Sequence, residues 1–182
     1  MPTEISIVNC QIGAKFRKPQ LRLRWTSPHM KDSLKTLYGI TSNKTSDSNF
    51  EFPINTIPND LINHFVRGFI DGDGYMGNNG EINNFSISIV GTSKKFISML
   101  GDIIANNTGM TYKIYENIGK TITYYSLRWS CNRTNKLDKI TKLQEYLYKN
   151  ATIFLKRKKE KIDTYIKYRA NALNNINAQC NA

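Results

Sequence analysis

The fold is decided by the stretch Val66-Arg-Gly-Phe-Ile-Asp-Gly-Asp-Gly74. The apolar residues before it recur at helical spacing, so Gly68 and Gly72, four residues apart, share one face of a predicted helix. Glycine inside a helix costs about 1 kcal/mol relative to alanine. Two glycines on one face therefore indicate close approach by a second helix, which only a missing Cβ allows.

The same helix ends in two carboxylates, Asp71 and Asp73. A helix C-terminus carries partial negative charge, so acids there are unfavourable unless a cation lies nearby. Two such ends packed together would gather hard oxygen ligands for a divalent metal. A plain glycine-rich helix end with exposed acids remains the alternative.

Two other interpretations of the glycines and acids fail on context. Residues 72–77 match a dinucleotide-binding fingerprint, but that loop must follow a strand and open a helix, whereas this one follows a helix. A calcium loop of the EF-hand type starting at Asp71 requires glycine and glutamate where the chain has Met76 and Ile82.

Hydrophobic periodicity predicts the elements on either side of this stretch. A helix begins near residue 58, and the order from residue 59 is α-β-β-α-β-β-α-α, an α+β fold. The later elements are a weak strand at 75–77, a clear strand at 85–90, a helix after Ser93, strands at 111–115 and 121–129 joined by a hairpin connection at 117–119, and helices at 134–149 and from about 151.

The N-terminal region has a strand-and-helix pattern of its own. Residues 20–25 alternate polar and apolar, and Ser27 and Pro28 suit the start of a helix that stops at Gly39. Residues 41–51 are expected to be a loop. The pattern at 21–38 recurs in kind at 85–104. We therefore expect an N-terminal extension at 1–55, a main domain at 56–170 and a disordered tail at 171–182.

The composition points to a polyanionic partner. The 182 residues include 26 Lys+Arg against 14 Asp+Glu, a net charge of +12, which favours nucleic acid. The basic residues form two clusters. The first consists of Lys15, Arg17, Lys18, Arg22 and Arg24, and the second of Lys156, Arg157, Lys158, Lys159 and Lys161. A solvated helix face is the alternative interpretation of the second cluster.

Other classes of protein are disfavoured. Three scattered cysteines are too few for a disulfide framework or a zinc cage. No apolar run approaches the roughly 20 residues of a membrane span. We expect a protein of a reducing intracellular compartment without membrane association.

The motif resembles the signature of the LAGLIDADG homing endonucleases. Only Arg67 departs from it, and the resemblance extends over about residues 50–166, while residues 27–53 resemble the end of a preceding half-domain. The matching positions are Gly68, Ile70, Asp71, Asp73 and Gly74, with Val66, Phe69 and Gly72 similar in type. The resemblance implies an αββαββα half-domain with a curved antiparallel DNA-binding sheet.

The resemblance also implies an activity: site-specific double-strand DNA cleavage by hydrolysis with a divalent metal, Mg²⁺ or Mn²⁺. Asp73 matches the catalytic metal-binding acid, and Lys158 is the best match for a catalytic basic residue, with Lys156 next. A simple phosphate contact is the other possible role of Lys158. An intron maturase, or a DNA-binding regulator that has lost cleavage, is the alternative function.

A cleavage site needs two motifs, and this sequence holds one. Gly68, Gly72 and Asp71 are therefore expected at a helix interface. The interface is formed either in a homodimer or with a separately encoded partner half. A third possibility is that residues 1–55 are the remnant of a first half.

The partner implied is double-stranded DNA, read by outward-facing strand residues. In the last two strands the sequence does not decide which alternate residues face outward. The candidates include Lys113 as well as Thr123 and Tyr125. The candidate DNA-binding residues are Ser86, Ser88, Ser93, Lys94, Lys113, Tyr115, Arg128, Lys156, Arg157 and Lys159.

Overall fold

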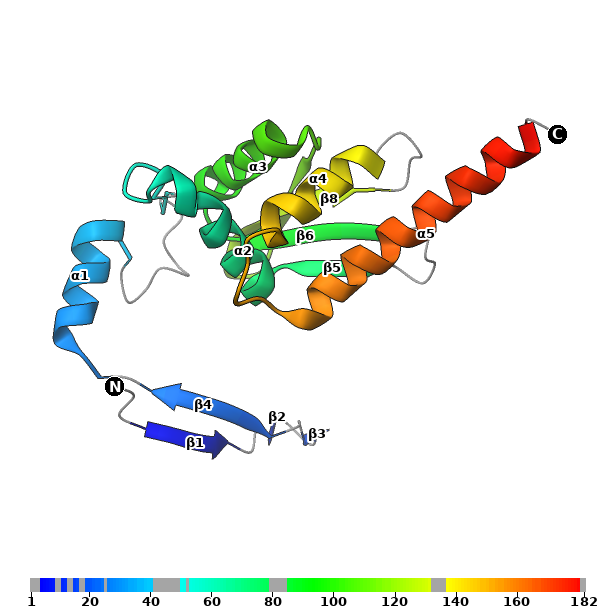
Figure 1. Cartoon of the computed structure of the whole chain (residues 1–182). Coiled ribbons are helices and arrows are strands. Elements are labelled where there is room, and N and C mark those ends of the chain that lie inside the picture. The colour runs from blue at the N-terminus through cyan, green and yellow to red at the C-terminus, as the bar shows by residue number, and fades with distance from the viewer. Residues whose placement is uncertain are drawn as a thin grey trace. The chain divides into compact units, whose positions relative to one another are not determined.

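A computed structural model of the chain describes residues 4–8, 11–12, 15–16, 19–24, 26–40, 50–51, 53–78, 85–131 and 137–180 (Figure 1). Two compact units are present, Met1–Thr41 and Ser42–Ala182. Each unit has its own strands and helices, and the motif lies in the second.

The second unit has the predicted order of elements. It comprises a 3₁₀ turn η2 (Asn59–Leu61), α2 (Ile62–Asp73), β5 (Tyr75–Asn78), β6 (Phe85–Gly91), α3 (Lys94–Thr108), β7 (Lys113–Ile118), β8 (Thr123–Ser130), α4 (Leu137–Tyr148) and α5 (Lys156–Cys180). The strands form one antiparallel four-stranded sheet in the order β5-β6-β8-β7. The α+β class and the αββαββα order are therefore confirmed.

One face of this sheet, the inner face, forms the core with the helices. Phe85, Ile87 and Ile89 of β6 are fully buried, as the alternation in that strand predicted. In Figure 1, α3 and α4 lie along one side of the sheet. The buried apolar residues that they add to the same core are Phe96, Ile97, Leu100 and Ile104 of α3, and Ile140, Leu143 and Leu147 of α4.

Local signals explain where α3 begins and ends. The Ser93 side chain accepts a hydrogen bond from the Phe96 backbone N–H at 3.2 Å, which caps the helix N-terminus. Gly109 ends the helix with φ of 70°, a conformation that glycine adopts without steric cost. The helix start after Ser93 was predicted from the sequence, whereas its end at Gly109 was not.

The first unit contains strands that periodicity did not predict. β1 (Glu4–Val8) pairs antiparallel with β4 (Gln20–Arg24), and β2 (Gln11–Ile12) pairs with β3 (Lys15–Phe16). The expected helix is present as α1 (Pro28–Tyr38), with Ser27 accepting from the Met30 N–H and Gly39 ending it. No residue of α1 is buried.

Several expected boundaries differ from the structure. The turn between β7 and β8 begins at Gly119, whose N–H donates to the Ile122 carbonyl at 3.1 Å, because residues 117–118 still pair with β8. Residues 171–180, expected to be disordered, continue α5. The helix extends beyond the sheet in Figure 1. Most of the expected loop at 41–51 lies outside the described residues.

Among the described helices, none has the length and apolar character needed to cross a lipid bilayer.

Candidate functional site

The site is built around the C-terminal end of α2. Gly74 follows the helix, and its N–H donates to the Ile70 carbonyl at 3.0 Å. A Cβ on Gly74 would lie 2.6 Å from the same carbonyl oxygen, so this position requires glycine. The close turn places Asp73 directly before the edge strand β5.

Asp71 holds the chain that follows α4. Its carboxylate accepts from the Tyr148 hydroxyl at 3.0 Å and from the Leu155 N–H at 2.9 Å. Burial, and then the nearby Asp71 charge, raise the pKa of Tyr148. Both carboxylate oxygens of Asp71 are thus engaged within the chain. The helix interface expected of this residue stays a prediction.

Lys158 is buried beneath the helix end. Its ammonium group donates to the carbonyl oxygens of Ile70, Asp71 and Gly74, the Asp71 contact being 2.8 Å long. These carbonyls lie at the C-terminal end of α2, where a helix has carbonyls without intrahelical partners; that of Ile70 also accepts from the Gly74 N–H. Burial lowers the pKa of Lys158, as do Arg157 and Lys161, while Asp71 and Asp73 oppose that shift.

The position of Lys158 shows what its side chain contacts within the chain. The side chain is 2% exposed, and its ammonium group has three backbone carbonyl partners. A phosphate or a catalytic water would have to compete with these bonds. Lys158 therefore caps α2 in the described chain, and its expected catalytic role stays a prediction.

Arg67 makes similar contacts one helical turn earlier. Its guanidinium group donates to the Leu147 and Ile153 carbonyls, each at 3.2 Å, and lies 2.6 Å from Nδ1 of His64. This residue was the one departure from the motif, and sequence reasoning assigned it no role. The signal in the sequence was an arginine within an amphipathic helix, because an arginine that becomes buried there needs partners.

These contacts give α2 two different sides. The anchored side consists of Arg67, Ile70 and Asp71, which bond to residues 147–158. The open side consists of Gly68, Gly72 and Asp73, all exposed. A Cβ at Gly68 or Gly72 would meet no atom within 4 Å, so nothing in the described chain explains why these positions are glycine.

Asp73 is the carboxylate left free for a cation. Within the described ranges, no cluster of three or more His, Cys, Asp or Glu side chains could hold a metal. Mg²⁺ keeps several waters and binds through one or two carboxylates together with substrate phosphates. A single exposed aspartate beside a phosphate fits that donor set.

The strand register decides which residues share the outer face of the sheet, the face opposite the core. Ser88 pairs with Tyr75 on one side and with Arg128 on the other, and Arg128 pairs with Lys113. Directly paired residues point to the same side. The row Tyr75–Ser88–Arg128–Lys113 therefore starts two residues after Asp73 and crosses the sheet.

The outer face includes further candidates from the sequence. Tyr115 pairs with Ser126 on this face, and the Arg128 guanidinium lies 5.4 Å from its ring centroid. Thr123 and Tyr125 belong to the inner face, so they are not among the outward-facing residues. Ser86 also belongs to the outer face, but it is only 8% exposed.

Ser93 is a correction to the DNA-binding candidates. It is buried, its hydroxyl donates to the Phe50 carbonyl, and it also caps α3. Both hydrogen-bonding functions of the hydroxyl are therefore used internally. Lys94, the next residue, is exposed, with its ammonium 5.8 Å from the Tyr125 ring centroid.

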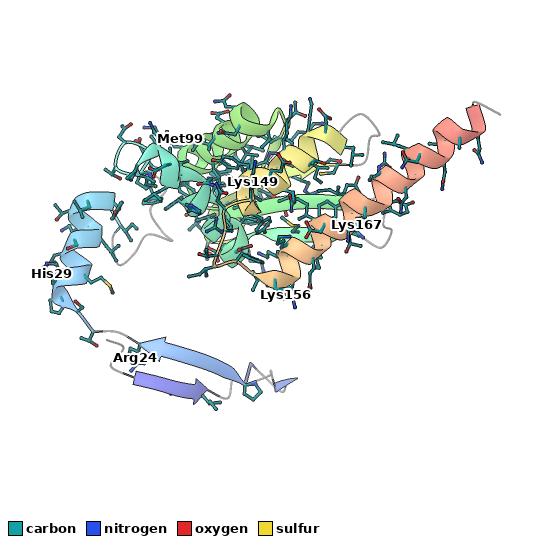
Figure 2. All side chains as sticks on the ribbon, viewed as in Figure 1. Arg24, His29, Met99, Lys149, Lys156 and Lys167 are labelled. Carbon is teal, nitrogen blue, oxygen red and sulfur yellow. The ribbon has the colours of Figure 1, made fainter. Side chains whose placement is uncertain are left out.

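The basic cluster of α5 is partly neutralised along the helix. Lys156, at its first turn (Figure 2), lies 3.8 Å from Glu160, and Lys159 lies 2.6 Å from Asp163. Two lysines of this cluster therefore have an acidic partner on the same helix. In the N-terminal cluster, Arg17 and Lys18 lie outside the described residues.

The comparison with protein families identifies the domain. The family model of the LAGLIDADG-like domain matches residues 60–162, more than half of the chain. The chain belongs to this family. The resemblance to the LAGLIDADG homing endonucleases is thereby confirmed, and the match runs from η2 into α5.

Other comparisons of this LAGLIDADG-like chain add less. A variant of I-DmoI, solved in complex with its target DNA and in the presence of Mn, is similar at 21% identity with a TM-score of 0.29. The match covers 50% of the present chain and 59% of that protein's chain. No curated protein matches the sequence.

Proposed function

We propose that this chain is a homing-type endonuclease that cleaves double-stranded DNA at a specific site by metal-dependent hydrolysis. The observation that carries the proposal is the exposed Asp73 carboxylate at the end of the motif helix. It lies directly before β5, where the polar and basic row of the outer face begins. A protein that only binds DNA would gain nothing from an acid at this point, because an acid repels phosphate.

Asp73 would hold the metal, Mg²⁺ or Mn²⁺, which when bound activates a water and stabilises the leaving oxygen of a phosphodiester. The rest of the site keeps that carboxylate in position. Asp71 fixes the helix end to Leu155, and Lys158 satisfies three carbonyls beneath Asp73. These bonds hold Asp73 on a well-defined helix end, which is the kind of support that a metal ligand needs.

Cutting both strands requires two copies of Asp73. We infer that the open side of α2 packs against a second motif helix, either in a homodimer or in a separately encoded partner half. The support is that both glycines of this side are exposed and make no contact that requires glycine. A homodimer would favour a roughly palindromic target, since protein symmetry is mirrored in the DNA site.

The second candidate is a maturase or a DNA-binding regulator that has lost cleavage. One observation favours it: Lys158, the best match for a catalytic base, is occupied in capping α2. Both candidates use the basic outer face. They differ only in whether Asp73 acts on a scissile phosphate.

Cleavage of a random-target DNA library with Mg²⁺ separates the two. We expect the wild type to release specific double-strand products and Asp73→Asn to bind DNA equally well while losing activity by at least about 10³-fold. The homodimeric endonuclease is excluded if the wild type cleaves nothing while both proteins bind DNA identically.

Sedimentation velocity tests the assembly. We expect a dimer, either free or on DNA, because a single Asp73 cannot serve both strands. A strict monomer in both states excludes the homodimer and leaves the separate partner half.

A further inference from the structure

The basic residues at the start of α5 fall into three environments. Lys156 and Lys159 form ion pairs along the helix with Glu160 and Asp163. Lys158 is buried under α2. Arg157 and Lys161 are exposed, and the described residues provide no ion pair for either. They are spaced i,i+4, so two like charges lie on one stripe of the helix, an unfavourable arrangement without a counter-charge.

Arg157 and Lys161 line an open groove of about 520 Å³ between α5 and the edge strand β5. Asn78 from the strand and Thr164 from the helix complete a set of hydrogen-bond donors around it. Glu160 also borders the groove, and its carboxylate lies 3.8 Å from Lys156. The groove therefore combines two cations that have no ion pair among the described residues with one carboxylate, that of Glu160, and with a neutral amide and a hydroxyl.

The groove is continuous with the outer face of the sheet. The Lys161 ammonium lies 3.3 Å from the position that a Cβ on Gly77 would occupy. Gly77 pairs with Ser86, so it belongs to the outer face, one row beyond Tyr75 and Ser88. The absence of a side chain at Gly77 leaves the space in which the lysine reaches over the sheet edge.

We propose that this groove binds a phosphodiester of the DNA backbone, held by Arg157 and Lys161 with Thr164 and Asn78 as neutral donors. The inference rests on the proposed function, because the same duplex must lie across the outer face. Phosphate oxygens accept strong hydrogen bonds from arginine and lysine. Such a contact fixes the register of the duplex on the sheet without reading sequence.

The chain contains its own matched controls, since α5 carries paired and unpaired cations within two turns. Arg157→Gln and Lys161→Gln remove the proposed contacts, whereas Lys156→Gln and Lys159→Gln remove ion-paired charges of the same helix. The full chain is titrated with a mixed-sequence DNA duplex in EDTA over a series of salt concentrations. Thermal unfolding of each variant checks that folding is retained.

We expect the slope of log K against log salt to become less steep by about 1 for each of Arg157→Gln and Lys161→Gln. Lys156→Gln and Lys159→Gln, which remove candidate DNA-binding residues that are already ion-paired within the helix, should make it less steep by clearly less than that. An equal effect at all four positions, or none at Arg157 and Lys161, overturns the groove while DNA binding itself persists. Absence of DNA binding by the wild type instead overturns the proposed function, and the groove with it.

Amine footprinting of the unmodified protein gives a second test that does not depend on variants. DNA should protect Lys161 from acylation and leave Lys156, whose side chain is 86% exposed, as reactive as before. Equal reactivity of Lys161 with and without DNA contradicts the proposal. Protection by a structured RNA but not by the DNA duplex also contradicts it, since the occupant would then be a different nucleic acid.

Discussion

The two sides of the motif helix differ in what they bond to. On the anchored side, Arg67 and Asp71 reach residues 147–155, and Lys158 reaches back to the carbonyls of the helix end. On the open side, Gly68 and Gly72 contact nothing and Asp73 is exposed. The difference shows that the described chain fixes the helix end with its own bonds, whereas it contains no contact that requires glycine at these two positions.

Removing the largest anchor should have the largest effect on stability. Lys158→Met removes the ammonium donor from the carbonyls of Ile70, Asp71 and Gly74, so we expect a loss of about 3 kcal/mol in the free energy of unfolding. Lys161→Met, three residues further along α5, should change stability by no more than about 0.5 kcal/mol. Urea unfolding measures both, and equal values would break the distinction between the two lysines.

Arg67→Met tests the second anchor. The Leu147 and Ile153 carbonyls lose a charged donor while the hydrocarbon stem is replaced, so we expect a loss of about 2 kcal/mol. Arg67→Lys should retain part of the stability, because an ammonium can bond to one carbonyl but cannot reproduce the planar fork. A neutral result for Arg67→Met would show that the motif tolerates any residue here.

Tyr148→Phe removes the hydroxyl that donates to Asp71, and we expect a loss of about 1–2 kcal/mol below pH 10. The pKa of Tyr148 is raised in the folded state, so its stabilisation is complete below the ordinary tyrosine value of 10.0 and declines as the pH rises above it. The difference in unfolding free energy between wild type and variant should therefore narrow above pH 10. A constant difference across alkaline pH would contradict the assigned bond.

A substitution on the open side should give the smallest change in the free energy of unfolding, and it should stabilise the protomer. Gly68→Ala adds a Cβ where no atom lies within 4 Å, so the isolated protomer should gain about 0.5–1 kcal/mol. The same substitution should weaken self-association measured by sedimentation. Gly74→Ala is the control, because its Cβ would lie 2.6 Å from the Ile70 carbonyl oxygen and should destabilise the protomer. Unchanged association of Gly68→Ala would remove the open side as an interface.

Periodicity predicted most of the second unit because its signals are local. The alternation in Phe85–Val90 and the helix start after Ser93 each depend on residues within one or two turns. The first unit was predicted less completely. Its strands β1–β3 have only two to five residues each, and pairing with a distant segment stabilises β1, which single-strand patterns do not reveal.

The roles of the charged residues were harder to predict than the elements. Three lysines of one basic cluster have different environments. Lys156 is ion-paired, Lys158 is buried and Lys161 borders a groove. Which cation is free depends on where α5 lies against α2 and β5. That packing is determined by the whole core, and the residues next to each lysine in the sequence do not indicate it.

The sequence by itself determined the motif and the order of elements, and its net charge of +12 predicts a polyanionic partner. Each follows from residue type and short-range spacing. The tertiary structure decided that Lys158 caps a helix 88 positions away, that Lys113 and Arg128 share a face, and that Gly68 and Gly72 lie uncovered. These depend on contacts between segments far apart in the chain, and such contacts become defined only when the core closes.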